Sequence, residues 1–212
     1  MNRLFPSLAF KVETLLSLLD DIPNSRKELL SVLVSEMWAR RSAGEGLRLN
    51  FICTHNSRRS QLGQVWAAVA AQVHGFALVE TYSGGTEKTA FNPRAIEALR
   101  HAGFRIEAQT DDVENPLYLV HFSDYAEPIR CFSKVYDAPE NPAHGFIAVM
   151  TCGEADQNCP VIFGAKRIPL LYDDPKVSDG TDSESAHYTE CSDQIATELL
   201  WVFREAKRGK FD

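Results

Sequence analysis

The 212-residue sequence lacks several features that would place it in other protein classes. No stretch approaches the ~18 uncharged apolar residues of a membrane helix. Basic residues are not in excess, because 22 Lys and Arg stand against 29 Asp and Glu, for a formal net charge of -7. The N-terminus carries Lys11, Glu13 and Asp20 and no small-residue cleavage site, which argues against a secretion signal. We therefore expect a cytoplasmic protein with no nucleic-acid or membrane partner.

Cysteine is also scarce, and its spacing does not suit metal binding. The five cysteines are an odd number over a long chain, which favours a reducing compartment over a disulfide scaffold. Cys152 and Cys159 have six residues between them, whereas paired zinc ligands usually stand two to four apart. We expect neither a metal site nor a cofactor, and we interpret Cys131 and Cys191 as inert packing residues.

The hydrophobic pattern predicts alternating helices and strands. Residues 7–20 and 25–41 have helical periodicity and are separated by Pro23, which predicts an N-terminal helical hairpin within residues 1–46. The predicted strands are 47–53, 77–85, one beginning near 104, 116–124, 128–137, 145–152 and 166–174, and the predicted helices are 61–75, 92–103 and 185–209. This order indicates an α/β domain over residues 47–212, a three-layer sandwich with a mostly parallel central sheet.

The segment CTHNSRR follows the first predicted strand and carries the strongest chemical signal. Its backbone N–H groups, at the start of a helix, would form a concave site for an oxyanion such as phosphate. Cys53 would be a thiolate nucleophile, Arg59 a planar clamp for two oxygens and Ser60 a donor to the thiolate. Asn56 is the residue best able to hold a left-handed backbone. The predicted oxyanion-binding residues are Thr54, His55, Asn56, Ser57, Arg58, Arg59 and Ser60. The alternative is a buried thiol beside solvated arginines.

A second candidate is Asp174 in LLYDDP. Pro175 restricts the preceding residue to extended conformations and so fixes where the Asp174 carboxyl points. Asp173 is the neighbouring alternative, and both acids could simply mark a turn.

CTHNSRRSQ, with YSGGT at 82–86 and YDDP at 172–175, resembles the low-molecular-weight protein tyrosine phosphatase superfamily, which includes thioredoxin-coupled arsenate reductases. The resemblance covers roughly residues 47–207 and leaves residues 113–144 as an insertion. It implies that Asp174 is the general acid and base facing the cysteine, and that Ser83 supports the cysteine loop. His55 replaces a usual glycine and Arg58 a common second cysteine.

CGEADQNCP resembles the redox cysteine pair of those reductases. The resemblance implies a relay in which Cys53 attacks arsenate, Cys152 displaces arsenite and bonds to Cys53, and Cys159 resolves that bond for reduction by thioredoxin. A disulfide needs Cα atoms within ~7 Å, whereas seven helical steps span ~10.5 Å, so a helical 152–159 segment must reshape on oxidation.

Three functions stay open. The first is an arsenate reductase, favoured because Lys176 and Val177 stand where phosphatases of this superfamily usually carry tyrosines. The second is a phosphatase that hydrolyses phosphate monoesters through a cysteinyl phosphate, with insertion aromatics such as Tyr118, Phe122 or Tyr125 against the substrate. The third is a non-catalytic oxyanion or redox sensor. The N-terminal hairpin could form a homodimer contact.

Overall fold

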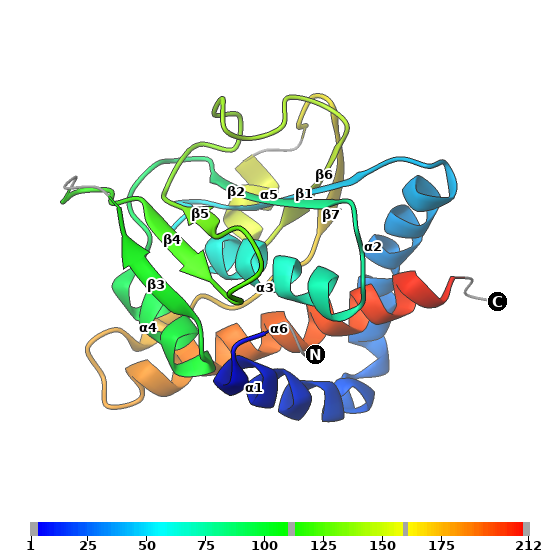
Figure 1. Ribbon diagram of the computed structural model, residues 1–212. Helices are drawn as coiled ribbons and strands as arrows, with labels where there is room; N and C mark the ends of the chain where they lie inside the picture. The colour runs from blue at the N-terminus through cyan, green and yellow to red at the C-terminus, as the bar shows by residue number, and fades with distance from the viewer. Residues whose placement is uncertain (1–3, 110–112, 159–160, 210–212) are drawn as a thin grey trace.

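A four-stranded parallel sheet organises the chain in the computed structural model, which describes residues 4–109, 113–158 and 161–209. Its strands are β1 (Leu47–Cys53), β2 (Val79–Gly85), β6 (Phe146–Met150) and β7 (Ala165–Pro169), in the order β2-β1-β6-β7 (Figure 1). β1 therefore lies in the interior of the sheet, between β2 and β6. The predicted α/β class with a parallel central sheet is confirmed.

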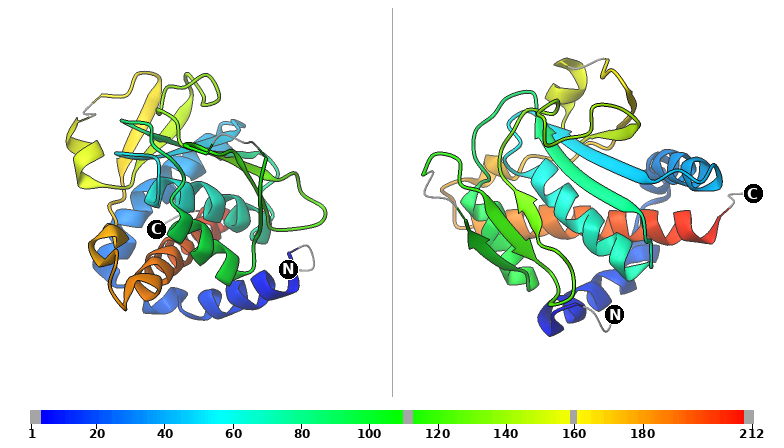
Figure 2. Two further views of the ribbon diagram at one scale, coloured as in Figure 1. Left: turned by 90° about the vertical axis from the view of Figure 1, so that its left-hand side faces the viewer. Right: turned by 45° about the horizontal axis from the view of Figure 1, so that its top comes forward.

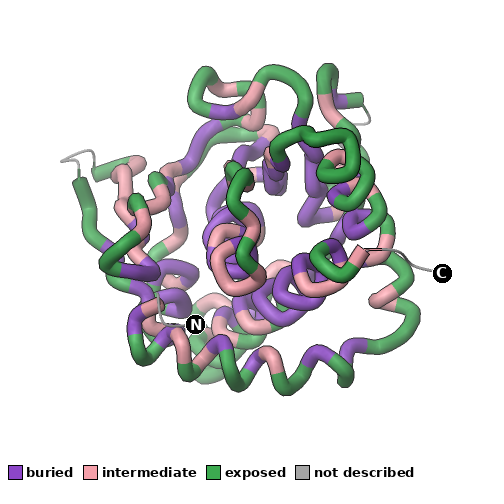
Figure 3. The backbone as a smooth tube through the Cα atoms, turned by 45° about the vertical axis from the view of Figure 1, so that its right-hand side comes forward, coloured by how far each residue is buried: buried purple, intermediate pink, exposed green. Residues whose placement is uncertain are grey.

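Residues on alternate sides of the strands face different layers. Leu49 and Phe51 of β1 join the large core beneath the sheet, whereas Ile52 joins a smaller cluster with Ala148 and Met150 of β6. The large core is covered by α3 (Arg59–Val73) and α6 (Glu184–Arg208), and the smaller one by α5 (Gly153–Asn158) and neighbouring loops (Figures 1 and 2). The buried residues lie mainly at the centre of the molecule (Figure 3).

Close packing of α3 on β1 depends on Gly63. A Cβ atom at this position would lie 2.5 Å from the Phe51 ring, so a larger residue would push the helix off the strand. Helix α4 (Pro93–Ala102) has the predicted boundaries, because the Asn92 side chain accepts a bond from the Arg94 N–H and Gly103 ends the helix with φ 107°.

The N-terminal helices are part of the main core. The predicted helices are present as α1 (Pro6–Ser17) and α2 (Asn24–Ser42), joined by η1 (Leu19–Asp21). Both pack on α6 and contribute to the large core, for example through Leu8 and Leu33. They are thus a covering layer of the α/β domain, fixed by α6. None of the helices in the described residues has the length and apolar composition that a membrane span requires.

The insertion contributes two strands to a second sheet, and the segment just before it contributes the third. β3 (Arg105–Ala108), β4 (Tyr118–His121) and β5 (Ile129–Cys131) form an antiparallel sheet in the order β3-β4-β5. The sequence predicted these strands but not their separation from the parallel sheet. Beyond β5, the described chain pairs with β2 at an isolated parallel bridge between Gly85 and Val135. Short strands joined by turns pair with one another more readily than with a distant sheet.

Candidate active site

Strand β1 ends at Cys53, and the loop of residues 54–58 leads directly into α3 at Arg59. Asn56 has φ 47° and is the one non-glycine residue with positive φ within the described ranges. This conformation matches the prediction for Asn56 and turns the loop back toward the helix axis. The loop is thereby wrapped around the start of α3.

The carbonyl groups of the loop are bonded to the surrounding protein. The Cys53 and Thr54 carbonyls accept from the N–H groups of Thr86 and Glu87 at 3.2 and 2.8 Å, and the Ser57 carbonyl accepts from Asn92 N–H at 2.9 Å. In contrast, no backbone N–H of residues 54–60 donates to an acceptor in the described part of the chain. Because the carbonyl groups of the loop bond outward to the surrounding protein, its N–H groups stay free to bind an anion at the positive end of α3.

Hydrogen bonds around Ser60 define the direction of donation to Cys53. The Asn56 side-chain amide donates to Ser60 Oγ at 2.9 Å, and Ser60 Oγ lies 3.0 Å from Cys53 Sγ. Because the amide occupies an acceptor position on Ser60, the hydroxyl hydrogen is available for the sulfur. All three side chains are buried. The arrangement thus places a hydroxyl donor against the sulfur of the candidate nucleophile.

Arg59 and Asp174 lie together beside the loop. Arg59 donates to Asp174 Oδ2 at 2.5 Å and to the Tyr172 carbonyl at 2.9 Å, while its Nε is buried without a partner in the described residues. Asp174 also accepts from the Lys176 N–H and caps the short helix η2 (Pro175–Ser178). Asp173 is exposed instead, so Asp174 is the carboxylate that the structure brings to Arg59.

Helix α2 contacts the segment that positions Arg59. Arg26 makes a two-point ion pair with Glu198 of α6, at 2.9 and 2.7 Å, and its guanidinium lies 4.9 Å from the Tyr172 ring centroid. Tyr172 is the residue whose carbonyl accepts from Arg59. The region before residue 47 therefore contacts the side chain of the residue whose carbonyl accepts from Arg59.

The side chains of Arg58 and His55 are directed away from the anion site. Arg58 Nε donates to the Tyr188 hydroxyl at 2.7 Å, and Tyr188 donates to Asp179 at 2.8 Å. The exposed His55 ring lies 3.5 Å from the Glu87 carboxylate. Arg58 is thus a tether between the loop and α6, and only the backbone N–H groups of these two residues remain candidates for oxyanion binding.

Thr54 connects the loop to Cys152. Thr54 Oγ1 donates to Glu154 Oε2 at 3.0 Å and lies 3.4 Å from Cys152 Sγ. A hydroxyl has one hydrogen. Because the Thr54 hydroxyl donates its hydrogen to Glu154, the Cys152 thiol is the donor in its contact with Thr54. Cys152 Sγ also accepts from the Ala155 N–H at 3.4 Å, at the first turn of α5. Cys159 lies outside the described residues.

Two further segments support the loop. The buried Ser83 hydroxyl lies within hydrogen-bond distance of Gln64 and Gln61, at 2.6 and 3.3 Å. Gln61 in turn donates to the Asn56 carbonyl at 3.0 Å, so Ser83 reaches the loop through Gln61. From the insertion, Ser133 Oγ donates to the His55 carbonyl at 2.9 Å. Sequence reasoning assigned no role to Gln61, Ser133, Tyr188 or Glu154. Gln61 and Glu154 stand within the motifs CTHNSRRSQ and CGEADQNCP, whereas no motif contains Ser133 or Tyr188.

Cys131 and Cys191 are both buried, as predicted. Burial raises the pKa of each thiol to about 12. They will stay protonated at neutral pH and are poor nucleophiles. Among the described residues, no three His, Cys, Asp or Glu side chains are grouped as a metal site requires.

Of the aromatic candidates in the insertion, Phe122 is buried and Tyr118 packs edge-on against Phe91, with ring centroids 6.0 Å apart. Phe122 and Phe91 belong to the large core, and Tyr118 packs against it. Tyr125 is exposed in the loop after β4.

Comparison with known proteins gives three results. The family model described as low molecular weight phosphotyrosine protein phosphatase matches residues 48–122. An arsenate reductase of Bacillus licheniformis is 30% identical over 151 residues, which cover 70% of this chain and 89% of that protein. An arsenate reductase of Bacillus subtilis has the same identity and the same coverage.

The fold also resembles that of a solved structure, a low molecular weight protein tyrosine phosphatase from Bacillus subtilis. The TM-score is 0.51, with 17% sequence identity over 76% of this chain and 98% of that one.

Proposed function

The chain belongs to the low molecular weight phosphotyrosine protein phosphatase superfamily, in the branch of its arsenate reductase relatives, and from this premise we propose that it reduces arsenate to arsenite. The observation that carries the proposal is a second thiol at the oxyanion loop, with Cys152 Sγ 3.4 Å from the hydroxyl of the residue that follows Cys53. Hydrolysis of a phosphate ester needs one cysteine, whereas a two-electron reduction by thiols needs two.

In the first step, arsenate binds to the N–H groups of the loop and to Arg59. The Cys53 thiolate attacks arsenic, and one arsenate oxygen leaves as water after taking a proton from Asp174. Arg59 would have to exchange its bond to Asp174 for bonds to the substrate, and its free Nε offers one donor at once. Donors of this kind stabilise charge that builds up in the transition state.

In the second step, Cys152 attacks Cys53 Sγ of the adduct. The S–S bond forms, the S–As bond breaks, and its electron pair stays on arsenic, which leaves as arsenite. Cys152 must lose its proton first, and the bonds at Thr54 provide a path: the thiol proton passes to Thr54 Oγ1 while the Thr54 proton passes to Glu154. We assign Glu154 as the proton acceptor for this step.

In the third step, Cys159 attacks the Cys152 sulfur and returns Cys53 as a thiolate. Residues 153–158 are helical, and seven helical steps span ~10.5 Å, so we propose that this helix unwinds or loops out when positions 152 and 159 form a disulfide. We propose that this reshaping presents the disulfide to thioredoxin as the reductant, in a reducing compartment such as the cytoplasm.

The experiment that tests the proposal compares two reactions of the purified protein. Wild type should reduce arsenate with a thioredoxin system, Cys152→Ser should release no arsenite, and Cys159→Ser should stop after at most one turnover. Hydrolysis of an aryl phosphate should persist in both variants, since it uses only Cys53, Arg59 and Asp174. Cys131→Ser is the matched control. Hydrolysis of the aryl phosphate by wild type without any reduction of arsenate would leave the phosphatase alternative as the function. Full arsenate turnover by Cys159→Ser would overturn the role of Cys159 in the relay.

The homodimer through the N-terminal region is a further proposal. Phe10 of α1 and Leu29 and Val32 of α2 are exposed apolar side chains that a second copy could cover. Sedimentation of wild type and of a variant with Ser at all three positions tests this proposal. A dimer that persists in the variant would contradict the proposed interface.

A further inference from the structure

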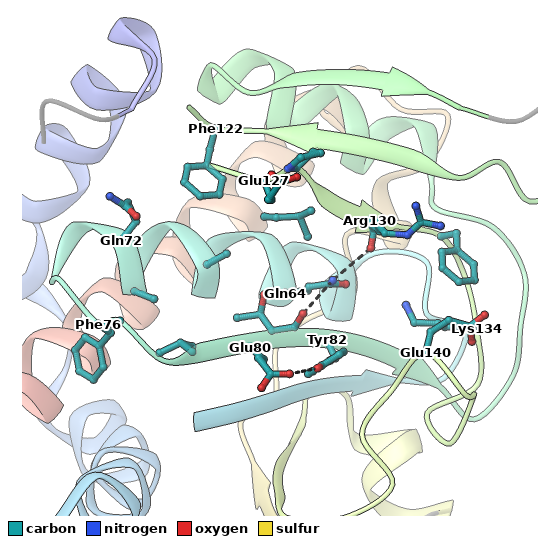
Figure 4. Close-up of a pocket in the computed structure, with 18 residues that line it drawn as sticks. Gln64, Gln72, Phe76, Glu80, Tyr82, Phe122, Glu127, Arg130, Lys134 and Glu140 are labelled. Carbon is teal, nitrogen blue, oxygen red and sulfur yellow. Dashed lines mark hydrogen bonds between the residues drawn. The ribbon is translucent and has the colours of Figure 1, made fainter. Parts of the chain in front are cut away.

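A groove separates the two sheets, and one end of it adjoins the oxyanion loop, because Lys134 in its lining donates its N–H to Asn56 Oδ1 at 2.9 Å. It has a volume of about 580 Å³. Its floor is α3, including Gln64, Ala68 and Ala71, and its walls are the edge strands β2 and β5 (Figure 4). Neither edge strand has a second partner along the groove, so each presents backbone groups to it.

The backbone of β2 offers hydrogen bonds into the groove at alternate residues. Leu78 O accepts from β1, whereas Gly85 bonds outward to the 134–136 segment, so the N–H and C=O groups of residues 79, 81, 83 and 85 point away from β1. The Thr81 carbonyl accepts from Gln64, but no described residue accepts from the N–H of Val79 or Thr81. On the opposite wall, Gln64 also donates to the Arg130 carbonyl at 3.4 Å (Figure 4).

One end of the groove is closed by the chain itself. The Gly85 N–H donates to the Lys134 carbonyl, and the Tyr136 N–H donates to the Gly85 carbonyl, both at 2.9 Å. These bonds occupy the edge of β2 beyond the groove. The Ser83 carbonyl is also occupied, because it accepts from the Asn141 side-chain amide at 3.0 Å. An extended chain that added to β2 alongside residues 79–82 would therefore have to end near Lys134.

Lys134 stands at this closed end. The residue is 5% exposed, and its ammonium lies 4.5 Å from the Phe132 ring centroid. Its backbone N–H donates to Asn56 Oδ1 at 2.9 Å, whereas no hydrogen bond or ion pair of the ammonium is found within the described residues. The amino group points into the groove (Figure 4). Burial lowers the pKa of Lys134, although the charge of Glu140, which lines the same groove, acts in the opposite direction. A bound carboxylate would offset that cost.

We propose that the groove binds the C-terminal strand of another polypeptide, which adds to the edge of β2 and places its terminal carboxylate against Lys134. At ~3.3 Å per residue, the free part of β2 accommodates a strand on the order of five residues. Side chains that face Ala68 and Ala71 would be apolar. The exposed Glu80 and Glu127 at the rim favour basic side chains at the alternate positions.

The test uses the full chain, immobilised, and two pools of random pentapeptides, one with free C-terminal carboxylates and one with C-terminal amides. Retained peptides are quantified by mass spectrometry. Wild type should retain the carboxylate pool at least tenfold over the amide pool, with apolar and basic residues alternating in the retained sequences. Equal retention of the two pools, or no retention, would overturn the proposal.

Two variants with matched controls locate the binding. Lys134→Met removes the charge and Thr81→Pro removes the edge N–H without touching the bonds to β1, and each should lower retention at least tenfold. Lys88→Met and Thr81→Val should retain the pool as wild type does. Thr81→Pro also keeps the test decisive if Lys134→Met does not fold. Undiminished retention by folded Thr81→Pro protein would overturn the proposal.

Discussion

Replacement of Ser60 by alanine tests the donor that stabilises the nucleophile. The hydroxyl lies 3.0 Å from Cys53 Sγ, and the Asn56 amide, 2.9 Å from the same oxygen, leaves its hydrogen for the sulfur. A hydrogen bond to a charged group is worth about 1.5–3 kcal/mol. Since each 1.36 kcal/mol is tenfold in rate, loss of this donor should lower kcat/KM about 10- to 150-fold.

The same substitution leaves the buried Asn56 amide without its acceptor, which should cost about 1–3 kcal/mol of stability. Two assays check the prediction: the rate at which iodoacetamide alkylates Cys53, followed by peptide mass spectrometry, and kcat/KM with arsenate and with an aryl phosphate. Ser57→Ala, in the same loop, is the control. A fall in kcat/KM of less than roughly threefold would refute a stabilising donor, because it corresponds to under ~0.7 kcal/mol.

Three further predictions concern the surroundings of the loop. Tyr188→Phe removes the hydroxyl that accepts from Arg58 and should lower the free energy of unfolding by about 2–3 kcal/mol in urea titrations, whereas an effect below ~0.5 kcal/mol would contradict the tether. Gly85→Ala would place a Cβ atom 2.6 Å from the Thr54 carbonyl oxygen, so it should cost about 1–3 kcal/mol and distort the loop, and unchanged turnover would contradict this. Burial lowers the pKa of His74 below its ordinary value of ~6.5. The contribution of His74 to stability should therefore be present above pH ~6.5 and lost as the pH falls. His74→Gln should accordingly reduce the fall in Tm between pH 7.5 and 5.5.

The parts of the fold that could be predicted from the sequence are those determined by residues close together in the chain. Helix α4 begins at the Asn92 cap and ends at Gly103, and Cys53 follows a buried strand, because capping, left-handed glycine and burial periodicity are all visible in short segments. The second sheet was not predictable in the same way. Strand segments specify pairing weakly on their own, and which sheet β3, β4 and β5 join depends on contacts distant in the sequence.

In the candidate site, too, local features were predictable and contacts between distant residues were not. The left-handed Asn56 and the bond between Ser60 and Cys53 follow from residue types within one loop. The partner of Arg58 did not follow, because Tyr188 lies 130 positions away and is brought to the loop only by packing of α6. Glu154 is similar: its carboxylate reaches Thr54 because β6 lies parallel to β1.

The central claim is that Cys53 and Cys152 act in one reaction. A single turnover with arsenate in the absence of any reductant, followed by peptide mapping under non-reducing conditions, tests it most directly. The account predicts one equivalent of arsenite per chain and a disulfide between Cys152 and Cys159, with Cys159→Ser protein stopped at a disulfide between Cys53 and Cys152. Arsenite released with Cys152 still reduced, or a Cys152→Ser variant that turns over as wild type does, would contradict it.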